Sequence, residues 1–275
     1  MLHILKYPGV RFRITGGEID LKRFTRLIAF LLVLACLPFA AAERLDDKVL
    51  LSYFDDSAFF SDSRGDSLMH YVNSIRQTDP SFLQGMKLIT VGSISLYMAS
   101  RKFNTGPFQF KYRNRKLALH GIVDKMQPKK VFVLLGLNDP VGAKPEKAVD
   151  WAETIIKNVR ETKPDTIIHF LSETPVTENY DREKEREGYQ ASLDHYNELL
   201  KAVCEKNDAL YINVADALKG EDNFLKLDYS NDKVCHLSEE GNAVLIEALK
   251  DYAQERYDLG LWDPFAEETE NEKAE

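Results

Sequence analysis

The chain alternates short apolar runs with longer amphipathic segments. The runs are Ala58 to Phe60, Leu88 to Val91, Val131 to Leu135, Thr166 to Leu171 and Ala209 to Val214. Each has the length of a buried strand rather than of a helix. Because a strand that is covered on both faces reads as a continuous apolar run, the pattern predicts a sheet of about five strands between layers of helices.

The segments between the runs carry apolar residues at helical spacing, which predicts one-sided helices. One has Trp151, Ala152, Ile155, Ile156 and Val159, and another has Leu193, Tyr196, Leu199, Leu200 and Val203. A last helix is predicted to follow the N-cap Ser238 and to bury Leu245, Ile246, Leu249, Tyr252 and Ala253. Connections of this length imply right-handed crossovers and a parallel sheet, and thus an α/β fold. The aperiodic segment Asn104 to Arg115 is expected to be a loop or a hairpin.

The first 42 residues have the pattern of a signal peptide. Lys22, Arg23 and Arg26 precede an apolar stretch from Leu27 to Ala42, which ends in three alanines. The stretch is shorter than the roughly 20 residues that span a bilayer, so cleavage near Ala42 is favoured over a retained anchor. Lipidation at Cys36 is a further alternative, although Val33-Leu34-Ala35 is a poor match to a lipoprotein processing site.

Composition then limits the domain organisation and the partners. With 275 residues and 44% hydrophobic content the chain can build one sizeable core. We expect a signal peptide at 1–42, one domain at 43–262 and an acidic, disordered tail at 263–275. Residues 1–42 carry six basic and two acidic side chains, so their removal takes the net charge from −8 to −12. An acidic surface argues against nucleic acid as a partner.

Two cysteines, Cys204 and Cys235, remain after cleavage. Outside the cytoplasm they could pair, and two buried free thiols are the equal alternative. No CxxC pair or histidine-rich tract is present, so no structural metal is expected.

Polar residues cluster directly after three of the predicted strands and ahead of the last helix. These segments are Ser61-Asp62-Ser63-Arg64, Gly92-Ser93, Gly136-Leu137-Asn138-Asp139 and Asp232 to Leu237. An open α/β sheet binds its ligands at the carboxyl ends of its strands. The four segments therefore predict one common site.

In this order the segments resemble those of the SGNH hydrolases, also called GDSL-type esterases, over roughly Ala58 to Tyr257. The most specific parts are Gly136-Leu137-Asn138-Asp139, which is similar to the family's GxND block, and His236-Leu237 ahead of a helix. The resemblance implies a flavodoxin-like, three-layer αβα fold. It also implies a serine hydrolase that needs no cofactor.

The resemblance assigns a role to each candidate residue. Ser63 is the implied nucleophile and His236 the base that takes its proton, because a serine hydroxyl is a poor nucleophile until it is deprotonated. Asp232 would hold the imidazole in the required tautomer. The oxyanion would be met by the backbone N–H groups of Ser63 and Gly92 and by the side-chain amide of Asn138.

Two alignments are possible for the nucleophile. A literal Gly65-Asp66-Ser67-Leu68 string is present, but Ser67 lies a helical turn beyond the expected strand end. We therefore align the family's Gly-Asp-Ser with Ser61-Asp62-Ser63. Ser61 then replaces a glycine, and the turn is strained if it needs a positive φ.

The histidine segment also departs from the family. The aspartate is usually three residues before the histidine, where this chain has Lys233, and Asp232 lies one residue further back. Asp228 is a weaker substitute.

The expected function is that of a secreted or cell-surface esterase that acts on short acyl or acetyl esters of small molecules or polysaccharides. The two departures motivate an alternative, a catalytically inactive binding protein with the same fold. A third possibility is an accessory subunit of a cell-surface complex that modifies acyl groups or glycans. Each of the named site residues also has a purely structural interpretation, as a helix cap, a turn or a solvated loop residue.

Overall fold

The computed structural model describes residues 43–103, 106–139, 144–180 and 188–266. The expected signal peptide, Cys36 and most of the expected acidic tail lie outside these residues. In chain order the elements are α2 (Asp47–Ser52), β1 (Ser57–Ser61), α3 (Ser63–Ile75), β2 (Met86–Thr90), α4 (Leu96–Ser100), β3 (Lys111–Tyr112), β4 (Arg115–Lys116), α5 (Leu119–Met126), β5 (Lys130–Leu134), α6 (Pro145–Thr162), β6 (Ile167–Leu171), α8 (Tyr189–Lys206), β7 (Leu210–Ile212), α9 (Ala215–Leu218), the 3₁₀ helix η1 (Leu227–Tyr229) and α10 (Glu239–Asp258).

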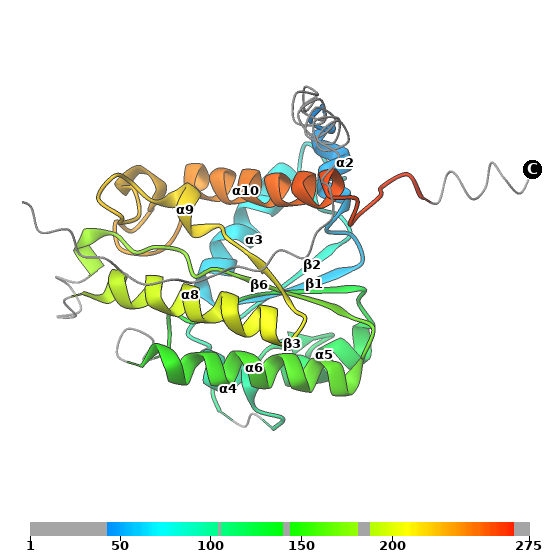
Figure 1. The fold of residues 1–275 in the computed structure, drawn as a ribbon, viewed down its shortest axis with the longest axis horizontal. Helices are drawn as coiled ribbons and strands as arrows, with labels where there is room; N and C mark the ends of the chain where they lie inside the picture. Colours follow the sequence, from blue (N-terminus) through cyan, green and yellow to red (C-terminus); the bar gives the residue numbers. More distant parts are fainter. Residues whose placement is uncertain (1–42, 104–105, 140–143, 181–187, 267–275) are drawn as a thin grey trace, which may run out of the picture. The chain divides into compact units, whose positions relative to one another are not determined.

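The five apolar runs form one parallel sheet with the strand order β2-β1-β5-β6-β7. Helices cover both faces: α3, α9 and α10 lie on one side, and α4, α5, α6 and α8 on the other (Figure 1). The predicted three-layer α/β fold with a flavodoxin-like strand order is thus confirmed. The chain turns to one side of β1 and later to the other, so the carboxyl end of β1 lies at the switch point of the sheet, where such folds bind ligands.

Side chains of the central strands alternate between two cores. In β1, Ala58 and Phe60 face the core under α5, α6 and α8, whereas Phe59 faces the core under α2, α3 and α10. All five residues of β1 are buried. This explains why β1 reads as a continuous apolar run and not as an alternating one.

Several smaller expectations can be compared with the structure. The last helix begins after the N-cap Ser238, whose hydroxyl accepts the N–H of Gly241. It buries four of the five expected side chains, and Tyr252 is only partly buried. The segment that was expected to be a loop or a hairpin ends in the hairpin of β3 and β4. Cys204 and Cys235 are both buried and form no disulfide. No helix in the described parts of the chain has the length and apolar character needed to cross a bilayer.

Candidate active site

Three of the predicted site residues lie in hydrogen-bonded contact. The Ser63 hydroxyl is 2.9 Å from Nε2 of His236, and Nδ1 of His236 is 2.5 Å from a carboxylate oxygen of Asp232. An ionised carboxylate can only accept, so Nδ1 carries the proton and Nε2 accepts from Ser63. The side chains of His236 and Asp232 are 35% and 34% exposed, so the group is open to solvent.

The turn from β1 into α3 places Ser63 at the start of the helix. Asp62 is the N-cap, and its carboxylate accepts the N–H of Arg64 at 3.0 Å. Ser63 is the first residue of α3. N–H groups in the first helical turn have no intrahelical partner, so the N–H of Ser63 is available to a ligand.

Ser61, which replaces the family's glycine, is an unstrained strand residue. It is fully buried, it is not among the residues with positive φ, and its hydroxyl donates to the Leu134 carbonyl at 2.9 Å. The space that it needs is left by Gly65, where an added Cβ would lie 2.3 Å from the Ser61 Cβ. The strain that the sequence suggested at Ser61 is therefore absent. The position that requires a glycine is 65, where α3 comes close to the Ser61 side chain.

Ser67, the serine of the literal GDSL string, does not take part in this arrangement. Its hydroxyl donates to the Arg64 carbonyl of its own helix at 2.7 Å. Of the two candidate serines, Ser63 is the one whose hydroxyl lies within hydrogen-bonding distance of His236.

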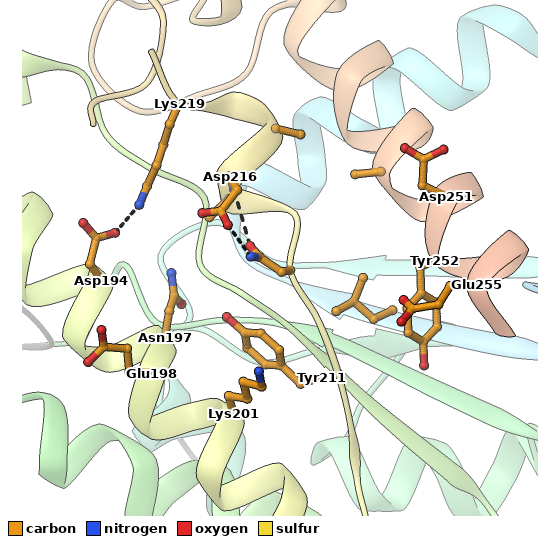
Figure 2. Close-up of a pocket in the computed structure, with 15 residues that line it drawn as sticks. Asp194, Asn197, Glu198, Lys201, Tyr211, Asp216, Lys219, Asp251, Tyr252 and Glu255 are labelled. Carbon is orange, nitrogen blue, oxygen red and sulfur yellow. Dashed lines mark hydrogen bonds and ion pairs between the residues drawn. The ribbon is translucent and has the colours of Figure 1, made fainter. Parts of the chain in front are cut away.

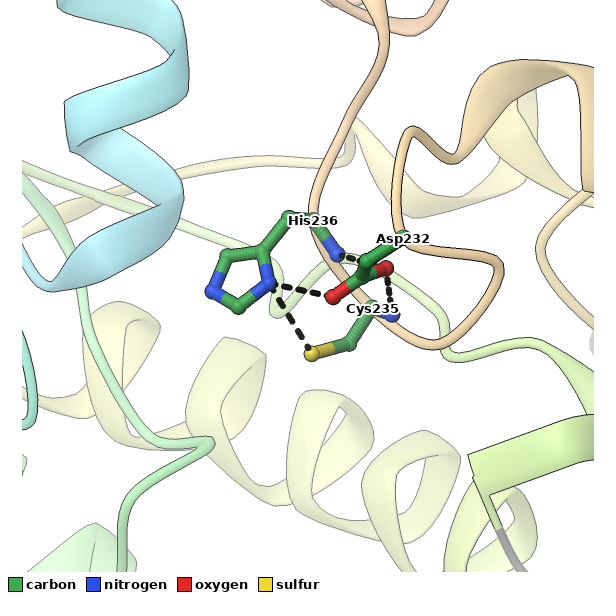
Figure 3. Close-up of side chains that lie close together, drawn as sticks. All are labelled: Asp232, Cys235 and His236. Atoms are coloured by element: carbon green, nitrogen blue, oxygen red, sulfur yellow. Dashed lines mark hydrogen bonds and ion pairs between the residues drawn. The ribbon is translucent and has the colours of Figure 1, made fainter. Parts of the chain in front are cut away.

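Asp232 organises the loop that carries His236. Its Oδ1 accepts the N–H groups of Val234, Cys235 and His236 at 2.8 to 3.1 Å and the Ser230 hydroxyl at 3.0 Å. Burial alone would raise the pKa of Asp232, but the hydrogen bonds from the His236 ring and from these three N–H groups hold it well below its usual value. The other oxygen, Oδ2, faces the His236 ring (Figure 3).

The additional residue between the aspartate and the histidine is accommodated at Lys233. Its φ of 59° lies in the left-handed region, and its carbonyl accepts from Oγ1 of Thr177 at 2.6 Å and from Nδ2 of Asn179 at 3.1 Å. Within the turn that contains this left-handed residue, Asp232 lies within hydrogen-bonding distance of the His236 ring. Asp228 lies in η1, and its backbone carbonyl accepts a hydrogen bond from the Ser238 hydroxyl at 2.8 Å.

The two other predicted oxyanion donors, Gly92 and Asn138, follow β2 and β5, the strands on either side of β1. Asn138 is exposed, and its amide donates to Asp62 at 2.9 Å and to the Ile94 carbonyl at 3.3 Å. To bind an oxyanion, the amide must give up one of these two hydrogen bonds and donate to the oxyanion instead. Gly92 lies in the turn after β2. The residue before it, Val91, donates its N–H to the Ser61 carbonyl of β1.

Asp139, the last residue of the same block, has a structural role. Its carboxylate accepts the N–H groups of Leu96 and Tyr97 at 2.5 and 3.0 Å, at the start of α4. Burial raises its pKa to about 6, although these hydrogen bonds oppose the shift.

A buried ionic cluster beneath Ser63 was not predicted from the sequence. Arg64 is 1% exposed, and its guanidinium contacts the fully buried carboxylates of Asp62, at 2.8 Å, and Glu173. Gly136 leaves room for Glu173, since a Cβ there would lie 2.9 Å from the Glu173 Cγ. The only signal in the sequence is that Arg64 and Glu173 each lie shortly after a strand end, at Ser61 and Leu171. The cluster fixes Asp62, the cap residue next to Ser63.

We expect Arg64→Met to lower the free energy of unfolding by about 3–5 kcal/mol, because two buried carboxylates lose their cation. Urea denaturation measures the change. Arg101→Met is the matched control: Arg101 is exposed, and its guanidinium contacts the hydroxyl and the ring of Tyr97, so its replacement should change stability by less than about 0.5 kcal/mol. Equal effects of the two replacements would contradict a structural role for the cluster.

A separate pocket lies along the edge strand β7, between α8, α9 and α10 (Figure 2). Its lining is rich in acidic side chains, and Asp194 pairs there with Lys219 at 2.7 Å. None of Ser63, Asp232 and His236 lines this pocket. The hydrogen-bonded residues at the end of β1 therefore remain the candidate active site.

Residues 99–244 match the model of the GDSL-like Lipase/Acylhydrolase family. This segment contains Asn138, Asp232 and His236, whereas Ser63 and Gly92 precede it. No curated protein matches the chain.

Solved structures support the same fold. A GDSL-like lipase from Bacteroides thetaiotaomicron superposes with a TM-score of 0.56 at 14% identity, covering 86% of this chain and 98% of that one. A protein of Bacteroides fragilis that was assigned as an acylhydrolase gives 0.54 at 13% identity, covering 88% and 99%. A Streptococcus pneumonia protein that was assigned as a platelet activating factor gives 0.51 at 19% identity, covering 85% and 99%.

Proposed function

This chain belongs to the GDSL-like lipase/acylhydrolase family, and from that membership we propose that it is an exported serine esterase that cleaves short acyl esters. Ser63 is the nucleophile, His236 the general base and Asp232 the carboxylate that orients the base. The observation that carries the proposal is the continuous hydrogen-bonded chain from the Ser63 hydroxyl through both ring nitrogens of His236 to Asp232.

The geometry supports the usual two steps of serine esterases. As the Ser63 oxygen attacks the ester carbonyl carbon, its proton passes to Nε2 of His236. The imidazolium that forms is stabilised by Asp232, which stays ionised because its pKa is held low. The histidine then returns the proton to the departing alcohol, and a water molecule, activated in the same way, releases the acid from Ser63.

The oxyanion of each tetrahedral intermediate would be bound by the N–H of Ser63, the N–H of Gly92 and the amide of Asn138. One such donor is typically worth about 10² to 10³ in rate. The Asn138 amide donates to Asp62 and to the Ile94 carbonyl, so substrate binding would include a reorientation of this side chain.

The surroundings favour a small acyl group on a polar alcohol. The triad is partly exposed and has polar side chains around it: Ser230 donates to Asp232, and Asn138 donates to Asp62, the residue before Ser63. Together with the signal-peptide pattern of residues 1–42, this supports an acetyl or other short-chain ester of a small molecule or polysaccharide as the substrate, outside the cytoplasm or at the cell surface. Apart from the ester substrate and water, the proposed steps use only side chains and backbone groups of this chain.

Two aspartate variants test the proposed function. We expect Asp232→Asn to lower kcat for p-nitrophenyl acetate by up to about 10⁴, because an amide permits the wrong imidazole tautomer. Asp228→Asn, the matched control in the same loop region, should leave kcat nearly unchanged. The reverse result would assign the carboxylate role to Asp228. If neither change has an effect, the enzyme works with a serine-histidine pair.

A further inference from the structure

A second set of ligand atoms surrounds the His236 ring. The thiol of Cys235 is 3.8 Å from Nδ1 of His236, the same nitrogen that contacts Asp232. Ligand atoms of the three side chains all lie within 4.8 Å of one another. Figure 3 shows the thiol and the carboxylate both facing this nitrogen, on the side of the ring away from Nε2.

We propose that Asp232, Cys235 and His236 form an inhibitory site for a thiophilic divalent cation such as Zn²⁺. The ligands are one carboxylate oxygen, one sulfur and one imidazole nitrogen, with a water molecule as the fourth. Sulfur and imidazole ligands favour Zn²⁺ over Mg²⁺ or Ca²⁺, which prefer oxygen ligands alone. The binding part of this proposal is independent of the proposed esterase activity, and the inhibitory part rests on it.

The distances require only small movements. Zn–N distances of about 2.0–2.1 Å and Zn–S distances of about 2.3 Å place the two ligand atoms about 3.6 Å apart at a tetrahedral centre. The Cys235 sulfur and the His236 nitrogen are already 3.8 Å apart. The Asp232 oxygen, now at 2.5 Å from the same nitrogen, must withdraw to roughly 3.3 Å to leave room for the ion.

The loop is already folded into the shape that the site needs. Oδ1 of Asp232 accepts the backbone N–H groups of the three residues 234–236, so all three ligating side chains start from one tight turn. Oδ2 is the carboxylate oxygen that points at the ring. Lys233, bonded through its carbonyl to Thr177 and Asn179, keeps the turn attached to the body of the protein.

Binding at Nδ1 would stop the proposed reaction. When the metal occupies Nδ1, the imidazole proton moves to Nε2, and the thiol proton passes to solvent as Cys235 becomes a thiolate. Nε2, which lies 2.9 Å from the Ser63 hydroxyl, then carries a proton and cannot accept another. The metal also takes the carboxylate that would stabilise an imidazolium. Ser63 thus loses the base that would take its proton, although the metal does not contact Ser63.

The binding test is a Co²⁺ titration of the untagged full-length protein, followed by the near-ultraviolet charge-transfer band that a thiolate–cobalt bond produces. We expect the band in the wild type and in Cys204→Ala, and its loss in Cys235→Ala. Cys204 is the matched control because it is also buried, and burial raises the pKa of its thiol to about 12. A wild type without the band, or a band that persists in Cys235→Ala, overturns the site.

The activity test is Zn²⁺ inhibition of p-nitrophenyl acetate hydrolysis, with each variant compared with its own rate in EDTA. We expect the half-inhibiting Zn²⁺ concentration to rise at least about tenfold in Cys235→Ala relative to Cys204→Ala, since even an indirect partner of a metal ligand is worth about 10- to 100-fold in affinity. Equal inhibition of both variants overturns the proposal and leaves the esterase function standing. A wild type without esterase activity refutes the proposed function, and the cobalt band then still decides the metal site.

Discussion

Ser63→Ala is expected to abolish hydrolysis of short p-nitrophenyl esters, with a loss in kcat of about 10⁴–10⁶. Ser63 is the residue at the carboxyl end of β1 whose hydroxyl contacts Nε2 of His236. Alanine keeps the helix start, since the cap is Asp62, so the fold should be unaffected. Steady-state kinetics, together with circular dichroism as a check on folding, measure the effect.

Ser67→Ala is the control that separates the two serines. The hydroxyl of Ser67 is bonded to the Arg64 carbonyl within α3, so its loss should leave kcat nearly unchanged. Activity that survives in Ser63→Ala and disappears in Ser67→Ala would falsify the alignment and restore the literal GDSL string as the nucleophile motif.

His236→Ala should lower kcat by a similar factor of about 10⁴–10⁶, because the base and the residue that it activates act as one unit. The thermal midpoint should change little, since a side chain that is 35% exposed contributes little packing. His195→Ala is the control: His195 is 49% exposed on α8, and its ring nitrogens lie near the exposed side chains of Glu146 and Glu198. Near-normal turnover of His236→Ala would remove this residue from the mechanism.

The sequence predicted the sheet well because the strands are buried on both faces. A run such as Val131 to Leu135 contains no polar residue, and its length is that of a buried strand rather than of a helix. The site could be placed because every polar segment followed a strand end or preceded the last helix. Ser63 was preferred to Ser67 on the same ground, and the Ser63 hydroxyl lies 2.9 Å from Nε2 of His236.

What the sequence could not predict depends on contacts between residues far apart in the chain. Arg64 and Glu173 form a buried ion pair across 109 positions, and nothing in either local sequence indicates the partner. The fit of Ser61 against Gly65 depends on how tightly α3 packs against β1. The left-handed φ of Lys233 is a property of a loop held by Thr177 and Asn179, whereas spacing alone suggested only a displaced aspartate.

The central claim, that Ser63 is an activated nucleophile, is tested most directly by a fluorophosphonate probe. The probe forms a covalent bond with a serine oxygen only when a neighbouring base activates it. Peptide mapping by mass spectrometry should locate the adduct on Ser63 in the wild type and find no adduct in His236→Ala. A folded wild-type protein that remains unlabelled, or that is labelled on Ser67, would contradict the account.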